Sequence, residues 1–190
     1  MKKINFKDIF VPTISLFLIC IVVSFLLAGT NELTKGPIAE IEAKTAAEAM
    51  KSVCPEAVSF DGGKGLEVEF YRGLDENGEV TGYAIPSAYK GYGGDVSIMV
   101  GIGINGDITG VEILSQSETP GLGANCTKES FTDMFKQPVP ENGFSVVKDS
   151  SGGEGGRIDA LTGATITSNA VTQAVNNAID IYNSLEGGTE

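Results

Sequence analysis

An uncharged, apolar stretch near the N-terminus constrains the fold of this chain more than any other feature. Residues 9–31 contain no charged side chain, and residues 11–28 are dense in Ile, Leu, Val and Phe. A helix needs about 20 apolar residues to cross a bilayer, and Pro12 is tolerated because it falls in the first turn. We therefore expect a single transmembrane helix over residues 9–29.

The charges on either side of this stretch predict its orientation. Residues 1–8 carry three lysines, whereas the region after the stretch is rich in glutamate. Because positive charge is retained on the cytoplasmic side, we expect residues 1–8 in the cytoplasm. A polar linker (residues 30–36) then leads to an extracytoplasmic domain over residues 37–186, and residues 187–190 form a disordered tail.

A cleaved signal peptide is the competing interpretation of the apolar stretch. Leu26 stands where an Ala-x-Ala cleavage site needs a small residue. Thr30 stands where a lipoprotein signal has its lipidated cysteine. We therefore favour a retained membrane anchor.

Composition excludes several classes of function. The net charge of −12 disfavours nucleic acid and anionic lipid headgroups as partners. The chain has no histidine, which excludes Ser-His-Asp and Cys-His catalysis and histidine-ligated zinc or haem. With Cys20 in the apolar stretch, Cys54 and Cys126 remain either as free thiols or as an extracytoplasmic disulfide, and we expect no metal site. Any redox chemistry must therefore come from an acquired cofactor.

Hydrophobic periodicity predicts an α+β domain, in which helices flank an antiparallel sheet. Helical spacing begins at Pro37 and ends near Val53, and a turn is expected at Asp61-Gly62-Gly63. Alternating residues predict strands over 66–71, 80–85, 96–104 and 108–114, with a hairpin turn at 75–78 and a bulge or edge position at Pro86. A short helix over 128–135, one strand at 144–147 and a terminal helix with an apolar face over 170–182 complete the domain.

The pattern G-x-G-x-x-G occurs at residues 101–106, where it could be mistaken for a dinucleotide-binding site. That mechanism requires a strand before the glycines and a helix opening within them. The residues that follow Gly106 alternate as a strand does. We therefore reject a Rossmann dinucleotide-binding interpretation of this pattern.

A cluster of small and hydroxyl residues precedes the terminal helix, in the sequence DALTGATITSN at 159–169. Gly163 and Ala164 leave room for a bulky group beside the hydroxyl of Thr165, and three residues of the N-cap type follow at 167–169. A helix N-terminus carries free N–H groups that stabilise a phosphate. From the residues alone, the ordinary interpretation is a loop that caps a helix.

A second motif is the sequence ETPGLG at 118–123. From the residues alone it predicts a type II turn, with Pro120 at the second position and Gly121 where a positive φ is needed. Upstream lie GYGGD at 91–95 and the strand after it.

The segment 159–165 resembles the flavinylation motif of the FMN-binding domain family, Asp-Gly-x-Ser/Thr-Gly-Ala-Thr. The order and spacing of the motifs at 91–95, 106–111, 118–123 and 159–165 resemble the G subunits of Rnf electron-transport complexes and the related C subunits of sodium-pumping NADH:quinone reductases. The short chain fits the Rnf subunits better. It departs from the family at Ala160, where Gly is common, and at Ser117, where we would expect His.

The resemblance implies a site for covalent FMN. A separate flavin transferase would use FAD to esterify the hydroxyl of Thr165, which makes this residue a phosphoryl threonine. The residues that the resemblance places around the attachment point are Asp159, Thr162, Gly163 and Ala164; those placed against the isoalloxazine ring are Glu118, Thr119, Gly121, Leu122 and Gly123. Tyr89 and Tyr92 are further aromatic candidates.

The function implied by the resemblance is electron transfer within a membrane complex. The chain would relay electrons between partner subunits of an Rnf complex, which couples ferredoxin oxidation and NAD reduction to ion transport. The chain by itself would not be a complete enzyme. The alternative is a non-redox, membrane-anchored scaffold or ligand-binding module.

Overall fold

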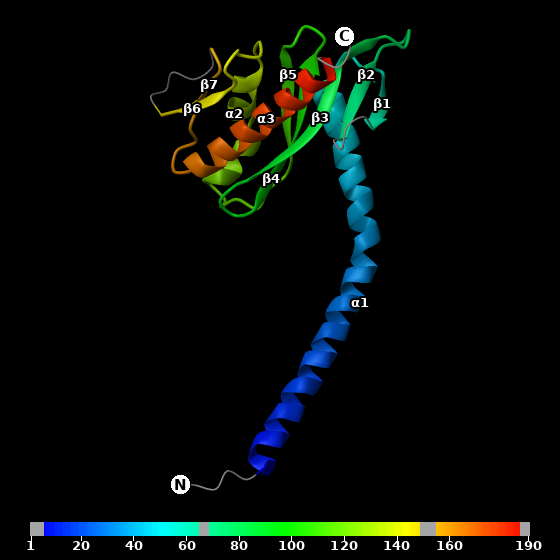
Figure 1. The fold of residues 1–190 in the computed structure, drawn as a ribbon, viewed down its shortest axis with the longest axis vertical. Coiled ribbons are helices and arrows are strands. Elements are labelled where there is room, and N and C mark those ends of the chain that lie inside the picture. The colour runs from blue at the N-terminus through cyan, green and yellow to red at the C-terminus, as the bar shows by residue number, and fades with distance from the viewer. Residues whose placement is uncertain (1–5, 65–68, 149–154, 187–190) are drawn as a thin grey trace. The chain divides into compact units, whose positions relative to one another are not determined.

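The computed structural model describes residues 6–64, 69–148 and 155–186 (Figure 1). The chain divides into two units, residues 1–44 and residues 45–190. Two predicted segments, the first residues of the chain and the tail at 187–190, lie outside the described residues.

The first unit consists of most of helix α1 (Phe6–Val53), a continuous helix of 48 residues. Its apolar part has a mean hydropathy of 2.7 over 18 residues, and its side chains are exposed. The structure differs from the sequence prediction at residues 30–36, which are helical, and at Pro37, which lies inside the helix. The hydroxyls of Thr30 and Thr34 bond back to carbonyls one turn earlier, so these polar residues are satisfied within a helix and do not end it.

The second unit is built on an antiparallel sheet whose strand order follows the chain. The strands are β1 (Ser59–Lys64), β2 (Glu69–Leu74), β3 (Val80–Lys90), β4 (Asp95–Gly103) and β5 (Ile108–Ser115). Each strand pairs with the next. The predicted α+β class and antiparallel sheet are therefore confirmed.

Of the two turns predicted near the start of the sheet, one forms and one does not. The turn predicted at Asp61-Gly62-Gly63 is wrong, because these residues lie in β1 and pair with β2. Part of the strand predicted over 66–71 lies outside the described residues. The predicted turn at 75–78 is confirmed: Gly78 has φ +81°, and the Asp75 carboxylate accepts backbone N–H bonds from Asn77 and Glu79.

Pro86 lies in the part of β3 for which pairing is described with β4 alone, which agrees with an edge position.

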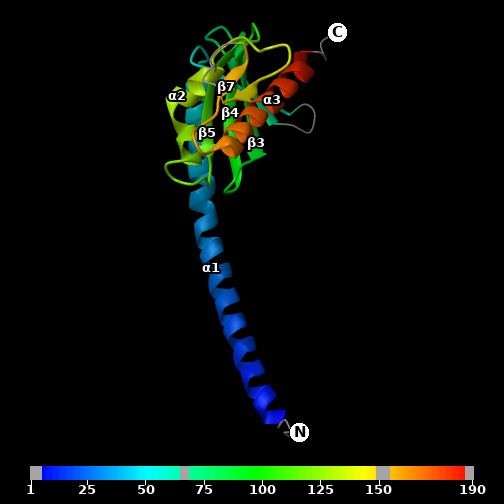
Figure 2. The same cartoon turned by 90° about the vertical axis from the view of Figure 1, so that its left-hand side faces the viewer.

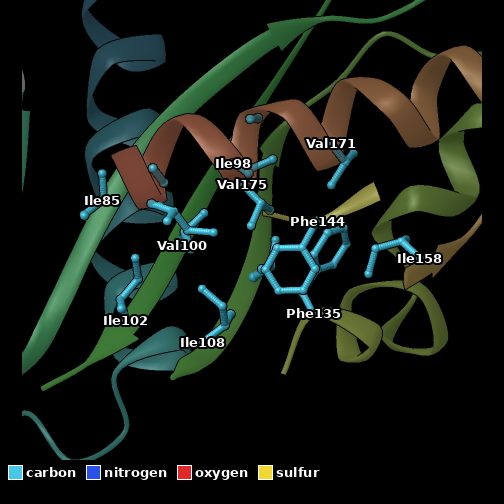
Figure 3. Close-up of a cluster of buried hydrophobic side chains, with 14 of the residues drawn as sticks. Ile85, Ile98, Val100, Ile102, Ile108, Phe135, Phe144, Ile158, Val171 and Val175 are labelled. Atoms are coloured by element: carbon cyan, nitrogen blue, oxygen red, sulfur yellow. The ribbon is translucent and has the colours of Figure 1, made fainter. Parts of the chain in front are cut away.

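One face of the sheet is covered by helix α3 (Thr165–Glu186), which packs along β3 and β4 (Figure 1). Alternate residues of β4 point to this face, and the predicted apolar face of α3 is buried against them. Figure 3 shows Val171 and Val175 of α3 in the same buried cluster as Ile98 and Val100 of β4. The main core of the second unit therefore lies between α3 and the sheet.

The other face of the sheet receives the last turns of α1, which belong to the second unit. Here Val53 contacts the backbone so closely that a Cβ on Gly101 would lie 2.2 Å from the Val53 carbonyl oxygen. A Cβ on Gly110, the partner of Gly101 across β4 and β5, would lie 3.1 Å from Cα of Val53. Thr109 donates a hydrogen bond to the same carbonyl.

This packing gives the glycines of the G-x-G-x-x-G pattern other roles. Gly101 admits the end of α1, and Gly106 has φ +79° in the turn between β4 and β5. A strand, β5, follows that turn. The glycines are therefore followed by a strand, as the sequence predicted, where a dinucleotide-binding pattern requires a helix.

Short elements close the end of the core beside β5 (Figure 2). They are η1 (Gly123–Thr127), α2 (Glu129–Thr132), η2 (Asp133–Phe135), and the parallel pair β6 (Ser145–Val147) and β7 (Arg157–Asp159). The helix predicted over 128–135 and the strand near 144–147 are thus present, whereas β7 was not predicted. Asn176 of α3 holds the start of β6, since its amide bonds both the N–H and the C=O of Phe144.

The two cysteines of the second unit are free thiols. Cys54 packs with Ala84 and Met99 on the α1 side of the sheet, whereas Cys126 belongs to the core on the α3 side. The sheet separates them. The disulfide that the sequence left open is therefore not formed.

Candidate functional site

A pocket of about 550 Å³ lies where the first turn of α3 meets the loop after β5. This volume falls in the usual range for small-molecule sites, about 300–1,000 Å³. Its lining combines the two motifs and the turn between β3 and β4: Tyr92, Glu118, Thr119, Leu122, Gly123, Gly163, Ala164, Thr165, Ile166 and Thr167.

The chain reaches α3 through a tight turn after β7. The N–H of Ala164 donates to the carbonyl of Leu161 (2.9 Å), and Gly163 adopts φ +74°, which favours glycine. Helix α3 then begins at Thr165, whose side chain is half-buried and lines the pocket. Since the first helical bond runs from the N–H of Ser168 to the carbonyl of Ala164, the N–H groups of residues 165–167 have no acceptor within the helix.

The residues of N-cap type at 167–169 do not cap α3, because the helix starts earlier than they suggest. Ser168 is buried; its hydroxyl accepts the N–H of Leu161 (2.9 Å) and donates to the carbonyl of Ala164 (3.1 Å). It thereby ties the turn before the helix to the first turn of the helix. Thr167 is also buried and points toward the loop after β5.

The loop at 118–123 contains the predicted turn. The N–H of Leu122 donates to the carbonyl of Thr119 (3.1 Å), and Gly121 has φ +80°. A Cβ on Gly121 would meet nothing within 4 Å, whereas one on Gly123 would lie 2.5 Å from Oγ1 of Thr167 and 2.6 Å from Oε2 of Glu118. Gly121 therefore serves the turn, and Gly123 serves the close packing of the pocket wall.

Glu118 is the charged residue in the pocket lining, and it is only 6% exposed. One carboxylate oxygen accepts the N–H of Gly93 at 2.9 Å, and the other accepts the hydroxyl of Thr167 at 2.5 Å. Burial, and then the negative charge of Glu118, raise the pKa of the nearby Cys126 thiol to about 11.

The rim of the pocket is apolar and open to solvent. Tyr92, Leu122 and Ile166 line it and are 73%, 43% and 55% exposed. Exposed aromatic and aliphatic side chains around a concavity are typical of a site that receives a flat apolar group.

The structure brings most of the predicted site residues together, but not all. Glu118, Thr119, Leu122, Gly123, Gly163, Ala164 and Thr165 line the pocket. Gly121, Asp159, Thr162 and Tyr89 do not: Asp159 ends β7, Thr162 is exposed in the turn after it, and Tyr89 lies in β3.

Three positions at the site escaped the sequence analysis as functional candidates: Gly93, Ile166 and Thr167. Thr167 looked like a cap residue, and no local pattern reveals that its hydroxyl meets a carboxylate from another loop. Gly93 carried a signal, since it lies in the GYGGD segment that takes part in the resemblance.

The residues of the pocket fit FMN. The free N–H groups at the start of α3 suit a phosphate beside Thr165, and the apolar rim suits an isoalloxazine ring. Gly123 and Gly163 lack side chains, which leaves space along the pocket wall; a Cβ on Gly163 would lie 3.1 Å from Leu122.

Comparison with known proteins finds a family match over the region that contains this pocket. Residues 91–180 match the model of the FMN-binding domain family, a span that includes every residue of the pocket lining.

Among curated relatives, three G subunits match almost the full chain. The G subunit of the ion-translocating oxidoreductase complex of Methanosarcina acetivorans is 34% identical, over 95% of this chain and 98% of the relative. The G subunit of the Na(+)-translocating ferredoxin:NAD(+) oxidoreductase complex of Acetobacterium woodii is 35% identical, over 96% of each chain. The G subunit of the proton-translocating ferredoxin:NAD(+) oxidoreductase complex of Clostridium ljungdahlii is 33% identical, over 96% of each chain.

Among solved structures, the C subunit of the Na(+)-translocating NADH-quinone reductase from Parabacteroides distasonis is 26% identical, with a TM-score of 0.49 over 58% of this chain and 59% of that one. The extent of the curated matches establishes the family. This chain, with its FMN-binding domain and its apolar N-terminal helix, belongs to the G subunits of ion-translocating (Rnf) oxidoreductase complexes.

Proposed function

We propose that this chain is the electron-transfer subunit of a membrane-bound, ion-translocating ferredoxin:NAD oxidoreductase, and that it carries FMN bound covalently to Thr165. The family supports the complex and the cofactor. The observation that carries the attachment site is the position of Thr165, which is the first residue of α3 and lines the pocket.

We assign attachment to a partner enzyme, as the family resemblance implies. A flavin transferase with FAD as donor fulfils the chemistry. The Thr165 oxygen forms a bond to the FMN phosphorus, the pyrophosphate bond of FAD breaks, AMP leaves, and the hydroxyl proton passes to the transferase. Asp159 and Thr162 lie just before the pocket in sequence and are exposed or half-exposed, which suits residues that the transferase reads.

The residues of the pocket would hold and orient the group. The N–H groups at the start of α3 stabilise the phosphate, and Leu122, Ile166 and Tyr92 pack against the ring. The bound cofactor would supply the one- and two-electron chemistry that the side chains of this chain lack. The open rim leaves an edge accessible to the redox groups of neighbouring subunits.

Ion transport itself would belong to other subunits. Within the described residues, one helix is long and apolar enough to span a membrane, and its apolar stretch carries no charged side chain for an ion path. One relative is named as Na(+)-translocating and another as proton-translocating, so membership of the family does not identify the transported ion. The lysines at the N-terminus support a cytoplasmic N-terminus and an extracytoplasmic FMN domain.

Mass spectrometry of the chain purified from its own membranes tests the proposal. The expected result is yellow protein, in which the peptide containing Thr165 carries the mass of FMN less one water. Colourless protein with an unmodified peptide would contradict the redox function and favour the non-redox scaffold.

A further inference from the structure

Glu118 connects three segments that are distant in sequence. Its carboxylate accepts the N–H of Gly93 in the turn between β3 and β4, and the hydroxyl of Thr167 in the first turn of α3. Its own N–H donates to the side-chain carbonyl of Gln116 at 2.6 Å. The two carboxylate contacts thus join the loop after β5 to two other walls of the pocket.

Three nearby glycines leave the space that Glu118 and the backbone before it occupy. A Cβ on Gly91 would lie 2.4 Å from Oε1 of Glu118, and one on Gly123 would lie 2.6 Å from Oε2. A Cβ on Gly93 would lie 2.0 Å from the carbonyl oxygen of Ser117. The close approach of three glycines means that the carboxylate occupies a fitted cavity, not a loose position at a rim.

The charge of this carboxylate is unusual for its degree of burial. Buried carboxylates are generally paired with a cation. Within the described residues, Glu118 has two neutral hydrogen-bond donors and no lysine or arginine in an ion pair. Its charge therefore acts on the pocket that it lines, and the burial of the carboxylate limits its screening by water.

We propose that Glu118 is a positioning residue: it locks the three walls of the pocket together, and its negative charge lowers the reduction potential of a flavin held there. The second half rests on the proposed function. A fixed negative charge beside the ring opposes the arrival of an electron, so the oxidised form is favoured.

The positioning role is tested on the full chain in detergent, in a flavin-free Thr165→Val background. Thr167→Val keeps the volume of the side chain but leaves one buried carboxylate oxygen without its donor, which lowers the unfolding temperature. Thr167→Ser restores the hydroxyl and loses only a methyl, so its unfolding temperature should lie above that of Thr167→Val. An equal or lower value for Thr167→Ser would overturn the positioning role.

The charge is tested in the flavinylated chain by spectroelectrochemical titration. Glu118→Gln keeps the shape and one acceptor, and Thr167 can rotate its hydroxyl to accept from the new amide. In-gel fluorescence should show that flavin remains attached, while the midpoint potential shifts to a more positive value. Glu129→Gln removes a charge from an exposed residue of α2, outside the pocket lining, and should leave the potential unchanged.

The outcomes separate the two claims. A potential in Glu118→Gln equal to that in Glu129→Gln would overturn the effect of the charge, although the proposed function would stand. A wild-type chain without flavin would overturn the proposed function and the charge effect together, and the comparison of Thr167→Val with Thr167→Ser would still decide the positioning role.

Discussion

The hydroxyl of Thr167 donates a hydrogen bond to the carboxylate of Glu118, a residue 49 positions earlier in the chain. This bond joins the first turn of α3, where the flavin attachment is proposed, to the loop after β5. Thr167 is therefore a structural residue of the site, and its substitution would not be a neutral control for the attachment experiment.

The attachment site can be tested with hydroxyl residues of the same pocket. Thr165→Val should abolish the fluorescent flavin band on a denaturing gel, because the valine has no oxygen for the phosphoester. Thr165→Ser keeps the oxygen and should retain some of the band. Thr119→Val is the matched control, since Thr119 also lines the pocket, and this variant should remain fluorescent. Loss of the band in Thr119→Val alone would refute the assignment.

The glycines of the 118–123 loop should differ in their effects. Gly123→Ala places a Cβ against Glu118 and Thr167, so it should change the flavin absorption spectrum and midpoint potential. Gly121→Ala has open space but a positive φ, which costs about 1–2 kcal/mol of stability and should leave the spectrum unchanged. The prediction fails if Gly121→Ala disturbs the flavin more than Gly123→Ala does.

The contact between the end of α1 and the sheet should depend on Gly101. Gly101→Ala would bring a methyl to 2.2 Å from the Val53 carbonyl oxygen, so it should lower the free energy of unfolding, by about 1–3 kcal/mol as overpacking does. Gly103→Ala meets its nearest atom at 3.5 Å, an ordinary contact, and should be neutral or stabilising by up to about 1 kcal/mol. Thermal unfolding of both variants in detergent checks the difference; equal stabilities would count against it.

The free energy of unfolding should fall at alkaline pH as the buried thiols of Cys54 and Cys126 lose their protons. Burial raises the pKa of Cys54, and burial with the charge of Glu118 raises the pKa of Cys126, each from 9.0 to about 11. Because the unfolded chain loses these protons first, the stabilisation is fully present below about pH 9 and is lost as the pH rises to about 11. In the double variant Cys54→Ala and Cys126→Ala, the free energy of unfolding should fall less steeply over this interval. An unchanged slope would show that the thiols do not contribute.

The orientation of the chain can be tested with reporters. A reporter that is active only in the cytoplasm should be silent when fused after Glu190 and active when fused before Met1, because the lysines of the N-terminus keep that end inside. Activity of the Glu190 fusion would reverse the proposed topology.

Much of the fold could be predicted because its signals are local. The alternation in β4 and β5, the Asn77-Gly78 turn and the helical spacing of α3 each express a short-range preference of the backbone. Predictions failed where a local signal was weak or was overridden. The residues Asp61-Gly62-Gly63 are typical of a turn, but they pair with β2. The polar residues before Pro37 predicted a linker, but they continue α1.

The sequence by itself determined the membrane helix, the α+β class, the family and the need for an external cofactor, because these depend on residue types and spacings along the chain. The acceptor Thr165 is a prediction from the motif at 159–165. Only the tertiary structure decided which residues form the pocket. It joined Glu118 to Thr167, placed Ile166 and Tyr92 on the rim, left Gly121 outside the lining, and put Cys54 and Cys126 on opposite faces of the sheet. Those relationships arise where separate segments pack together, and the chain carries no local pattern that records them.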